Sequence, residues 1–153
     1  MWRKITEFLT QDSVSHQQVS QGDELKIAIA ALLVTTAHAD EHAHEEEHIA
    51  LHRILTEHFH LNDEDTRTLI EQAEQQSADA IDLHRFVHVV NRDLDNEERK
   101  DIIKHAWRIV LADGVIDNIE DNLMRKLGSL MGIGRKESVF LRHEVEAENV
   151  SEK

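Results

Sequence analysis

The chain has 153 residues, which is enough to bury one hydrophobic core and too few to require a second compact domain. Its formal net charge of -14 argues against a nucleic-acid partner, because affinity for a phosphate backbone needs a surface rich in Lys and Arg. No apolar stretch is long enough to form a transmembrane segment, and the absence of Cys excludes disulfides and thiolate chemistry.

The composition predicts an all-α fold. No Pro interrupts the chain, and Ala, Leu, Ile, Glu, Gln, Lys and Arg dominate its periodic stretches. The alternating Val, Thr and aromatic runs that indicate strands are missing. The first residues lack the basic start and long apolar run of a secretion signal, so we expect a cytoplasmic location.

The first predicted element is a short amphipathic helix over residues 1–10, in which Trp2, Ile5 and Phe8 recur at nearly helical spacing. Residues 11–22 are polar and rich in Ser and Gln, which is typical of a linker. Two interpretations of the helix stay open. It folds back on its own domain, or it makes peripheral contact with a membrane or a partner protein.

The rest of the chain is expected to form one compact bundle of about seven helices. The predicted division is an N-terminal helix and linker, a helical domain and a C-terminal tail, at residues 1–22, 23–147 and 148–153. Helical periodicity predicts the seven helices at residues 24–39, 45–60, 64–76, 82–92, 96–112, 118–131 and 135–147.

Local patterns support these helix ends and the core. Asp117 with Glu120 matches a capping box at the start of the sixth helix, and Gly114 suits a left-handed cap before it. Asp95 with Glu98 repeats the box. Eight large residues on apolar helix faces are expected in one core: Leu33, Leu55, Leu69, Phe86, Ile103, Trp107, Leu127 and Leu130.

The chain also contains an internal repeat. Ala39-Asp40 recurs as Ala112-Asp113, and Glu47 recurs at the same offset as Glu120. Two helix-loop-helix units, residues 25–61 and 102–133, therefore occupy equivalent places in the domain. We expect them to pack with pseudo-twofold symmetry.

These repeats carry a resemblance to a known family. Residues 107–120, which read WRIVLADGVIDNIE, resemble the second repeat of the TerB (tellurite resistance) family, and residues 30–47 are similar to its first repeat. Residues 82–99 resemble the connecting region of the short, stand-alone bacterial members. The resemblance covers about residues 23–146.

The resemblance implies a compact all-α domain with internal pseudo-symmetry and no catalytic residue. It also implies an acidic surface that binds divalent cations or partner proteins, in the context of tellurite resistance and of envelope or metal stress. Carried over by position, the acidic candidates are Asp113, Asp117 and Glu120 in the second repeat and Asp40 and Glu47 in the first.

The first candidate metal site is the turn that carries Asp113, Asp117 and Glu120. Three oxygen ligands within eight residues could contribute to a Ca²⁺ or Mg²⁺ site. The alternative is plain helix capping, because Asp117 and Glu120 already form a capping box and the twelve-residue spacing of an EF-hand is absent.

The second candidate metal site is the His-rich start of the predicted helix over residues 45–60. Glu45, His48 and His52 lie on one helical stripe with His44 near its edge, and such nitrogen and carboxylate ligands suit Zn²⁺, Ni²⁺ or Cu²⁺. Residues 41–44 depart from the family pattern, which makes a hard-cation site less expected there. The alternative is a solvated helix face.

An enzyme is not expected. Three Glu-x-x-His matches fit the pattern of di-iron bundles, but all lie in or beside one helix instead of on two facing helices. No nucleophile elbow or phosphate-binding loop is present. The sequence thus favours a non-catalytic module that binds a divalent metal, an unknown protein partner or both. The alternative is a protein-binding scaffold without metal.

Overall fold

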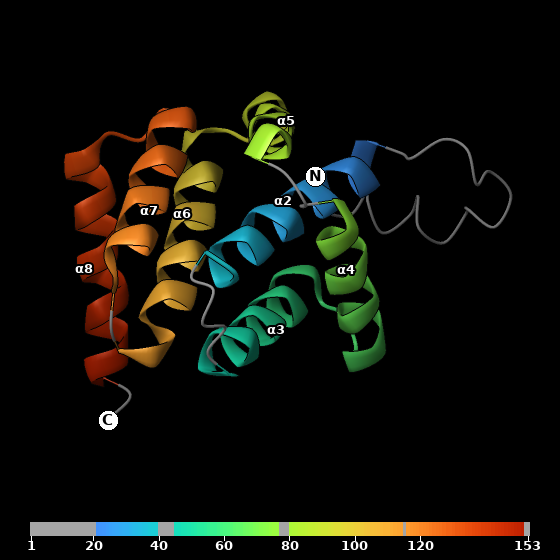
Figure 1. Cartoon of the computed structure of the whole chain (residues 1–153), viewed down its shortest axis with the longest axis horizontal. Coiled ribbons are helices and arrows are strands. Elements are labelled where there is room, and N and C mark those ends of the chain that lie inside the picture. Colours follow the sequence, from blue (N-terminus) through green and yellow to red (C-terminus); the bar gives the residue numbers. More distant parts are fainter. Residues whose placement is uncertain (1–20, 40–44, 77–79, 115, 152–153) are drawn as a thin grey trace, which may run out of the picture.

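The computed structural model describes residues 21–39, 45–76, 80–114 and 116–151. These residues form α-helices and one short 3₁₀ helix, with no strand among them, so the all-α prediction is confirmed (Figure 1). The elements are α2 (Gln21–Ala37), α3 (Glu45–Phe59), α4 (Asp63–Gln76), α5 (Ala80–Asp93), α6 (Asn96–Val110), η1 (Leu111–Asp113), α7 (Asn118–Leu130) and α8 (Arg135–Ser151). The predicted helix over residues 1–10 and nearly all of the predicted linker lie outside the described residues.

Helix α2 lies at the centre of the bundle. It contacts α3, α4, α5 and α6, and residues 28–34 are all buried. A helix that is apolar on every side must be covered on every side. Ala28, Ala30 and Ala31 help because their small side chains let neighbouring helices approach closely.

Helices α6, α7 and α8 form one end of the molecule, where they stand side by side (Figure 1). Helix α6 also packs against α2 and α3, so it joins this end to the rest of the core. The two repeat units therefore meet through α2 and α3 on one side and α6 with η1 on the other.

The predicted core is confirmed for all but one residue. The buried members are Leu33, Leu55, Leu69, Phe86, Ile103, Trp107 and Leu127. Leu130 is only half-buried against the core. It ends α7, where its carbonyl oxygen accepts a hydrogen bond from the Asn91 side chain at 2.9 Å.

The last helix is longer than the periodicity predicts. Helix α8 extends to Ser151, because Glu148 is held against α6 by two hydrogen bonds from Arg108, at 3.0 and 2.8 Å. Helix α2 begins earlier than predicted, at Gln21, and Glu24 in its first turn pairs with Arg92 of α5 at 3.1 Å. Long-range ion pairs of this kind are invisible to helical periodicity.

Candidate functional site

The turn between α6 and α7 is built by local capping. Gly114 adopts the left-handed region, with φ 82°, and ends η1. The Asp117 carboxylate accepts a hydrogen bond from the Glu120 N–H at 2.8 Å, and the Glu120 carboxylate accepts one from the Asp117 N–H at 3.2 Å. The predicted capping box is confirmed, and it fixes the Glu120 side chain in place.

Glu120 meets its repeat equivalent in the interior of the protein. Glu47 of α3 is 0% exposed and Glu120 of α7 is 2% exposed. The Glu47 side chain is close enough to influence the pKa of Glu120, and we call these two residues the glutamate pair. Neighbouring carboxyl groups in a buried place disfavour the ionisation of both, so the pair tends to keep a proton.

The electrostatic environment favours the protonated form. Burial raises the pKa of Glu120 above its usual value, and the negative charges of Asp117 and Asp113 raise it further. Hydrogen bonds from the Asp117 backbone and from Glu47 act in the opposite direction. A cation can replace the proton of such a buried acid, because the neighbouring acids attract the cation and disfavour ionisation without it.

The fold brings the glutamate pair together because α3 packs against α6 and η1. The internal repeat predicts that Glu47 and Glu120 are equivalent, and equivalent positions near a pseudo-twofold axis can touch. The sequence therefore identifies both residues as equivalent. Only the packing of the two units shows that they lie together.

The described residues do not bring the predicted ligands into a complete metal site. No group of three or more His, Asp and Glu side chains in the described ranges is arranged to hold an ion. Asp113 and Asp117 are half-buried near the glutamate pair, whereas Asp40 and His44 lie outside the described residues. The structure thus supplies two converging carboxyl groups, and the ligand role of Asp40 and His44 stays a prediction.

The predicted histidine stripe lies on α3. Glu45 is exposed and His48 is half-buried. The His48 ring packs edge-on against His38, with 4.9 Å between the ring centroids. The His38 Nε2 atom lies 3.2 Å from a carboxylate oxygen of Glu74 on α4. His48 therefore has a neighbour just after the end of α2 that the stripe alone does not reveal.

His52 lies one turn further along α3 and has a different neighbour. Its Nε2 atom is 2.9 Å from a carboxylate oxygen of Asp63, the first residue of α4. His48 and His52 share a stripe as predicted, but the His48 ring packs against His38 whereas His52 pairs with Asp63 of α4. A shared metal would require both rings to turn toward each other.

A second pair of titratable groups, which is half-buried, was not predicted. His58 of α3 and His105 of α6 are 3.2 Å apart between Nδ1 and Nε2, and we call them the histidine pair. Arg108 lies 2.9 Å from Nδ1 of His105. Because Arg can only donate, His105 accepts at Nδ1 and carries its proton on Nε2, which donates to His58.

Burial keeps the histidine pair neutral. It lowers the pKa of His105 to about 3, and the positive charges of Arg108 and protonated His58 lower it further. Burial also lowers the pKa of His58, which the charge of Asp101 partly offsets. Since Arg108 also binds Glu148, this network ties α3, α6 and α8 together.

Both the sequence and the fold are similar to those of known proteins. The sequence model described as tellurite resistance protein TerB matches residues 26–143, which span both repeats and the glutamate pair. The fold is similar to that of a crystal structure of a protein of unknown function from Porphyromonas gingivalis W83. That likeness has a TM-score of 0.61 and 18% sequence identity, and it covers 88% of this chain and 96% of the other. No curated protein matches the sequence.

Within the described ranges, no helix is both long enough and apolar enough to cross a membrane.

Proposed function

The chain belongs to the TerB family of tellurite resistance proteins, and from this premise we propose that it is a non-catalytic module that binds a divalent cation at the glutamate pair. The observation that carries the proposal is the burial of two repeat-equivalent carboxyl groups close to each other. Burying two acids stabilises a fold poorly. A binding role would explain why two acids are buried here.

The chemistry of the site favours a hard cation. Both groups of the glutamate pair are carboxyls, and the Asp113 charge lies close enough to raise the pKa of Glu120. Oxygen ligands of this kind suit Ca²⁺, Mg²⁺ or Mn²⁺ better than metals that prefer nitrogen or sulfur. Asp40, the repeat equivalent of Asp113, is the further ligand that the sequence predicts. Zn²⁺ and Ni²⁺ fit the histidine stripe instead.

We also propose that a protein partner contacts the surface beside this site. Two exposed large apolar residues, Ile49 at 59% and Ile119 at 56% exposure, lie near the starts of α3 and α7. They are close in sequence to Glu47 and Glu120 respectively. Apolar side chains beside a charged site are typical of an interaction surface. A cation that fixes the starts of both helices would then influence partner binding, in a role in metal or envelope stress resistance.

Titration calorimetry on the full chain tests the cation site. Ca²⁺, Mg²⁺, Mn²⁺, Zn²⁺ and Ni²⁺ are titrated into metal-free protein, and thermal melts are recorded with each ion and with EDTA. Binding to the folded state must raise the melting temperature. The expected result is saturable binding of at least one hard cation, with a matching rise in the melting temperature.

Substitution of one acid separates this site from general attraction to an acidic surface. Glu47→Gln keeps the shape of the side chain, removes its charge and should abolish the cation response. Glu46→Gln removes the same charge from the adjacent exposed position and should leave the response within about twofold of the parent, because exposed charges are strongly screened. Equal responses of the two variants would contradict the proposal. Absence of any cation response in the parent would leave the protein-binding scaffold.

A further inference from the structure

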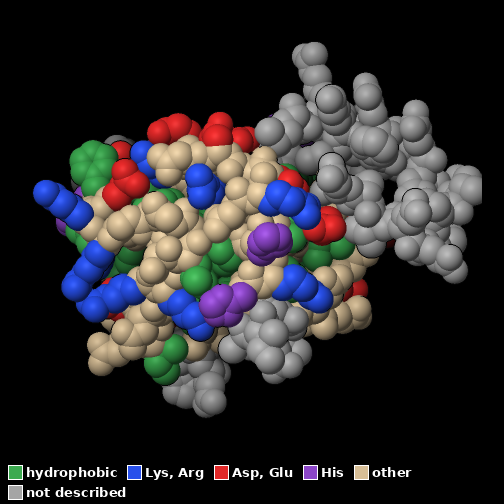
Figure 2. All heavy atoms as spheres, turned by 90° about the horizontal axis from the view of Figure 1, so that it is seen from above, with side chains coloured by type: hydrophobic (Ala, Val, Ile, Leu, Met, Phe, Trp, Pro, Cys, Tyr) green, Lys and Arg blue, Asp and Glu red, His purple; other side chains and the backbone are tan. Residues whose placement is uncertain are grey.

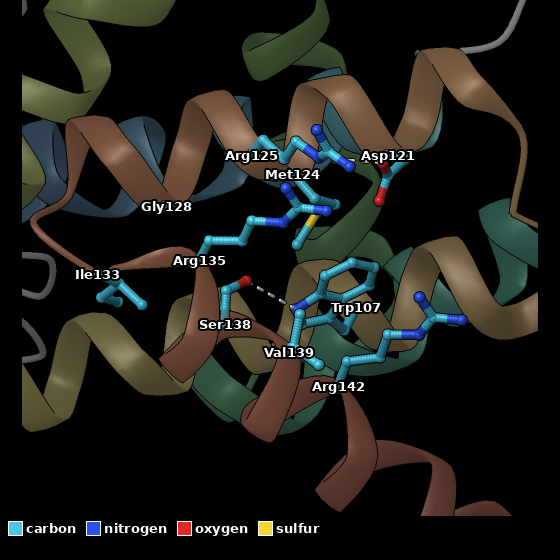
Figure 3. A pocket seen from close by; sticks show the side chains of 10 residues that line it. All are labelled: Trp107, Asp121, Met124, Arg125, Gly128, Ile133, Arg135, Ser138, Val139 and Arg142. Atoms are coloured by element: carbon cyan, nitrogen blue, oxygen red, sulfur yellow. Dashed lines mark hydrogen bonds and ion pairs between the residues drawn. The ribbon is translucent and has the colours of Figure 1, made fainter.

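A cavity of about 260 Å³ lies between α7 and α8, beside the indole ring of Trp107 on α6 (Figure 3). Met124 and Ile133 provide apolar walls. Gly128 lets the turn after α7 pack closely, since a Cβ there would lie only 3.0 Å from the Ile133 carbonyl oxygen. The Trp107 indole N–H donates a hydrogen bond to the Ser138 hydroxyl at 3.3 Å, which holds the ring in position.

Three guanidinium groups line the same cavity, those of Arg125, Arg135 and Arg142. Arg125 forms an ion pair with Asp121, one turn earlier on α7, at 3.1 Å. Figure 3 shows the Arg135 side chain reaching from the start of α8 across the opening toward α7. No acidic group among the described residues forms an ion pair with Arg135. Two cations that face one opening repel each other unless an anion lies between them.

Arg142 presents a further donor to the cavity. Its guanidinium lies 5.5 Å from the centroid of the Trp107 ring. Its Nε atom is buried and forms an ion pair with the Glu146 carboxylate at 3.7 Å, which is too long for a hydrogen bond. A buried charged donor without a hydrogen bond is costly, which indicates that an acceptor from outside the chain suits this position.

The charge around the cavity is opposite to that of the whole chain. The charged residues that line the cavity are Arg125, Arg135 and Arg142 against Asp121, whereas the full sequence has 17 Lys and Arg against 31 Asp and Glu. Figure 2 shows Lys and Arg side chains gathered at the end of the molecule that α7 and α8 form. Anions are therefore attracted to this end and repelled from most of the remaining surface.

We propose that this arginine cleft binds a small organic anion, in which a carboxylate or phosphate group is carried on a compact apolar body. Guanidinium groups match the paired oxygen atoms of such anions. Met124 and Ile133 would contact the apolar body. The volume is below the usual range for drug-sized ligands, which favours a compact molecule. The cleft shares no lining residue with the glutamate pair, so this inference stands apart from the proposed cation site.

Binding is measured by following the Trp107 indole N–H in ¹H–¹⁵N spectra of the full chain. The sequence has two Trp residues, so a Trp2→Phe background leaves one indole signal. Inorganic phosphate, phenyl phosphate and benzoate are titrated separately at constant ionic strength. The expected result is a saturable shift of this signal, with phenyl phosphate binding more tightly than inorganic phosphate. No saturable shift with any of the three up to about 10 mM would overturn the proposal.

A matched pair of variants separates the cleft from a general basic surface. Arg135→Ala should weaken phenyl phosphate binding about tenfold, because it removes a charge-assisted hydrogen bond. Lys136→Ala removes the same charge from the adjacent exposed position, outside the cavity lining, and should change binding less than about twofold. Both sites are exposed, so both variants should fold, which unchanged melting temperatures confirm. Equal weakening of binding in the two variants, or binding only to phosphatidylglycerol vesicles, would contradict the proposal and indicate a general basic surface.

Discussion

The buried glutamate pair and the half-buried histidine pair both join residues far apart in the sequence, yet burial gives them opposite responses to pH. In each pair the neutral form is favoured because charge is poorly solvated in the interior. A neutral carboxyl holds a proton, whereas a neutral imidazole lacks one. The same physical cause therefore stabilises the protonated state of Glu120 and the deprotonated state of His105.

The comparison also distinguishes a site from a structural contact. The histidine pair belongs to a continuous network that ends in the bidentate pairing of Arg108 with Glu148. The glutamate pair places two acids together and adds the charges of Asp113 and Asp117 nearby. The first arrangement is expected to stabilise the fold. The second is expected to cost stability until a cation binds.

The largest expected effect on stability comes from Arg108→Ala. This change leaves Glu148 without its bidentate partner and His105 without its donor, so the free energy of unfolding should fall by about 2 kcal/mol. Lys104→Ala breaks a single ion pair between the same two helices, Lys104 with Glu144 at 3.0 Å, and should cost about 0.5 kcal/mol. Urea denaturation of both variants measures the difference. Similar losses would show that the network adds nothing beyond one surface ion pair.

The histidine pair should make the protein sensitive to acid. An unfolded His titrates near 6.5, whereas the folded pKa of His105 is about 3. The stabilising contribution is thus complete above about pH 6.5 and is lost as the pH falls, by up to about 1.4 kcal/mol per pH unit for each proton taken up on unfolding. Urea melts at pH 7, 6 and 5 should show this fall. In His105→Gln the fall should be shallower, and an equally steep one would remove His105 from the explanation.

Glu120→Gln should change stability with the opposite dependence on pH. The folded pKa of Glu120 lies above its unfolded value of 4.5, so its contribution is most favourable below about pH 4.5 and is lost as the pH rises through the folded pKa. In EDTA, the variant should therefore gain stability relative to the parent between pH 5 and pH 8. The Gln side chain can still accept the capping hydrogen bond. A constant difference across that range would show that Glu120 ionises normally.

The sequence predicts contacts between residues that are close in the chain better than contacts between residues that are far apart in it. The capping box of Asp117 and Glu120 is local, and residue types three apart reveal it. The Glu47–Glu120 contact requires the packing of α3 against η1. The repeat therefore identifies the two residues as equivalent but does not predict that they lie together. All of α4, all of α5 and the first part of α6 separate His58 from His105, and no periodicity links them. The arginine cleft looks in sequence like two ordinary polar helix faces.

The smallest expected effect on stability is that of the double substitution His48→Ala with His52→Ala. Both side chains are partly exposed, so the free energy of unfolding should change by less than about 1 kcal/mol. Calorimetry at pH 7.5 with Zn²⁺ and Ni²⁺ tests their predicted role as ligands, since loss of two imidazoles should weaken binding and leave Ca²⁺ binding unchanged. Unchanged Zn²⁺ and Ni²⁺ affinity would return these residues to a solvated helix face.

Proton release on cation binding tests most directly the claim that a cation replaces a proton held by the glutamate pair. Ca²⁺ or Mn²⁺ is titrated into metal-free protein near pH 6 in buffers of different ionisation enthalpy, which reports the number of protons released. We predict up to about one proton per cation bound, with less release as the pH rises and the pair ionises unaided. The Glu120→Gln variant should release none. Cation binding without proton release at any pH between about 5 and 6, or identical release in Glu120→Gln, would contradict the account.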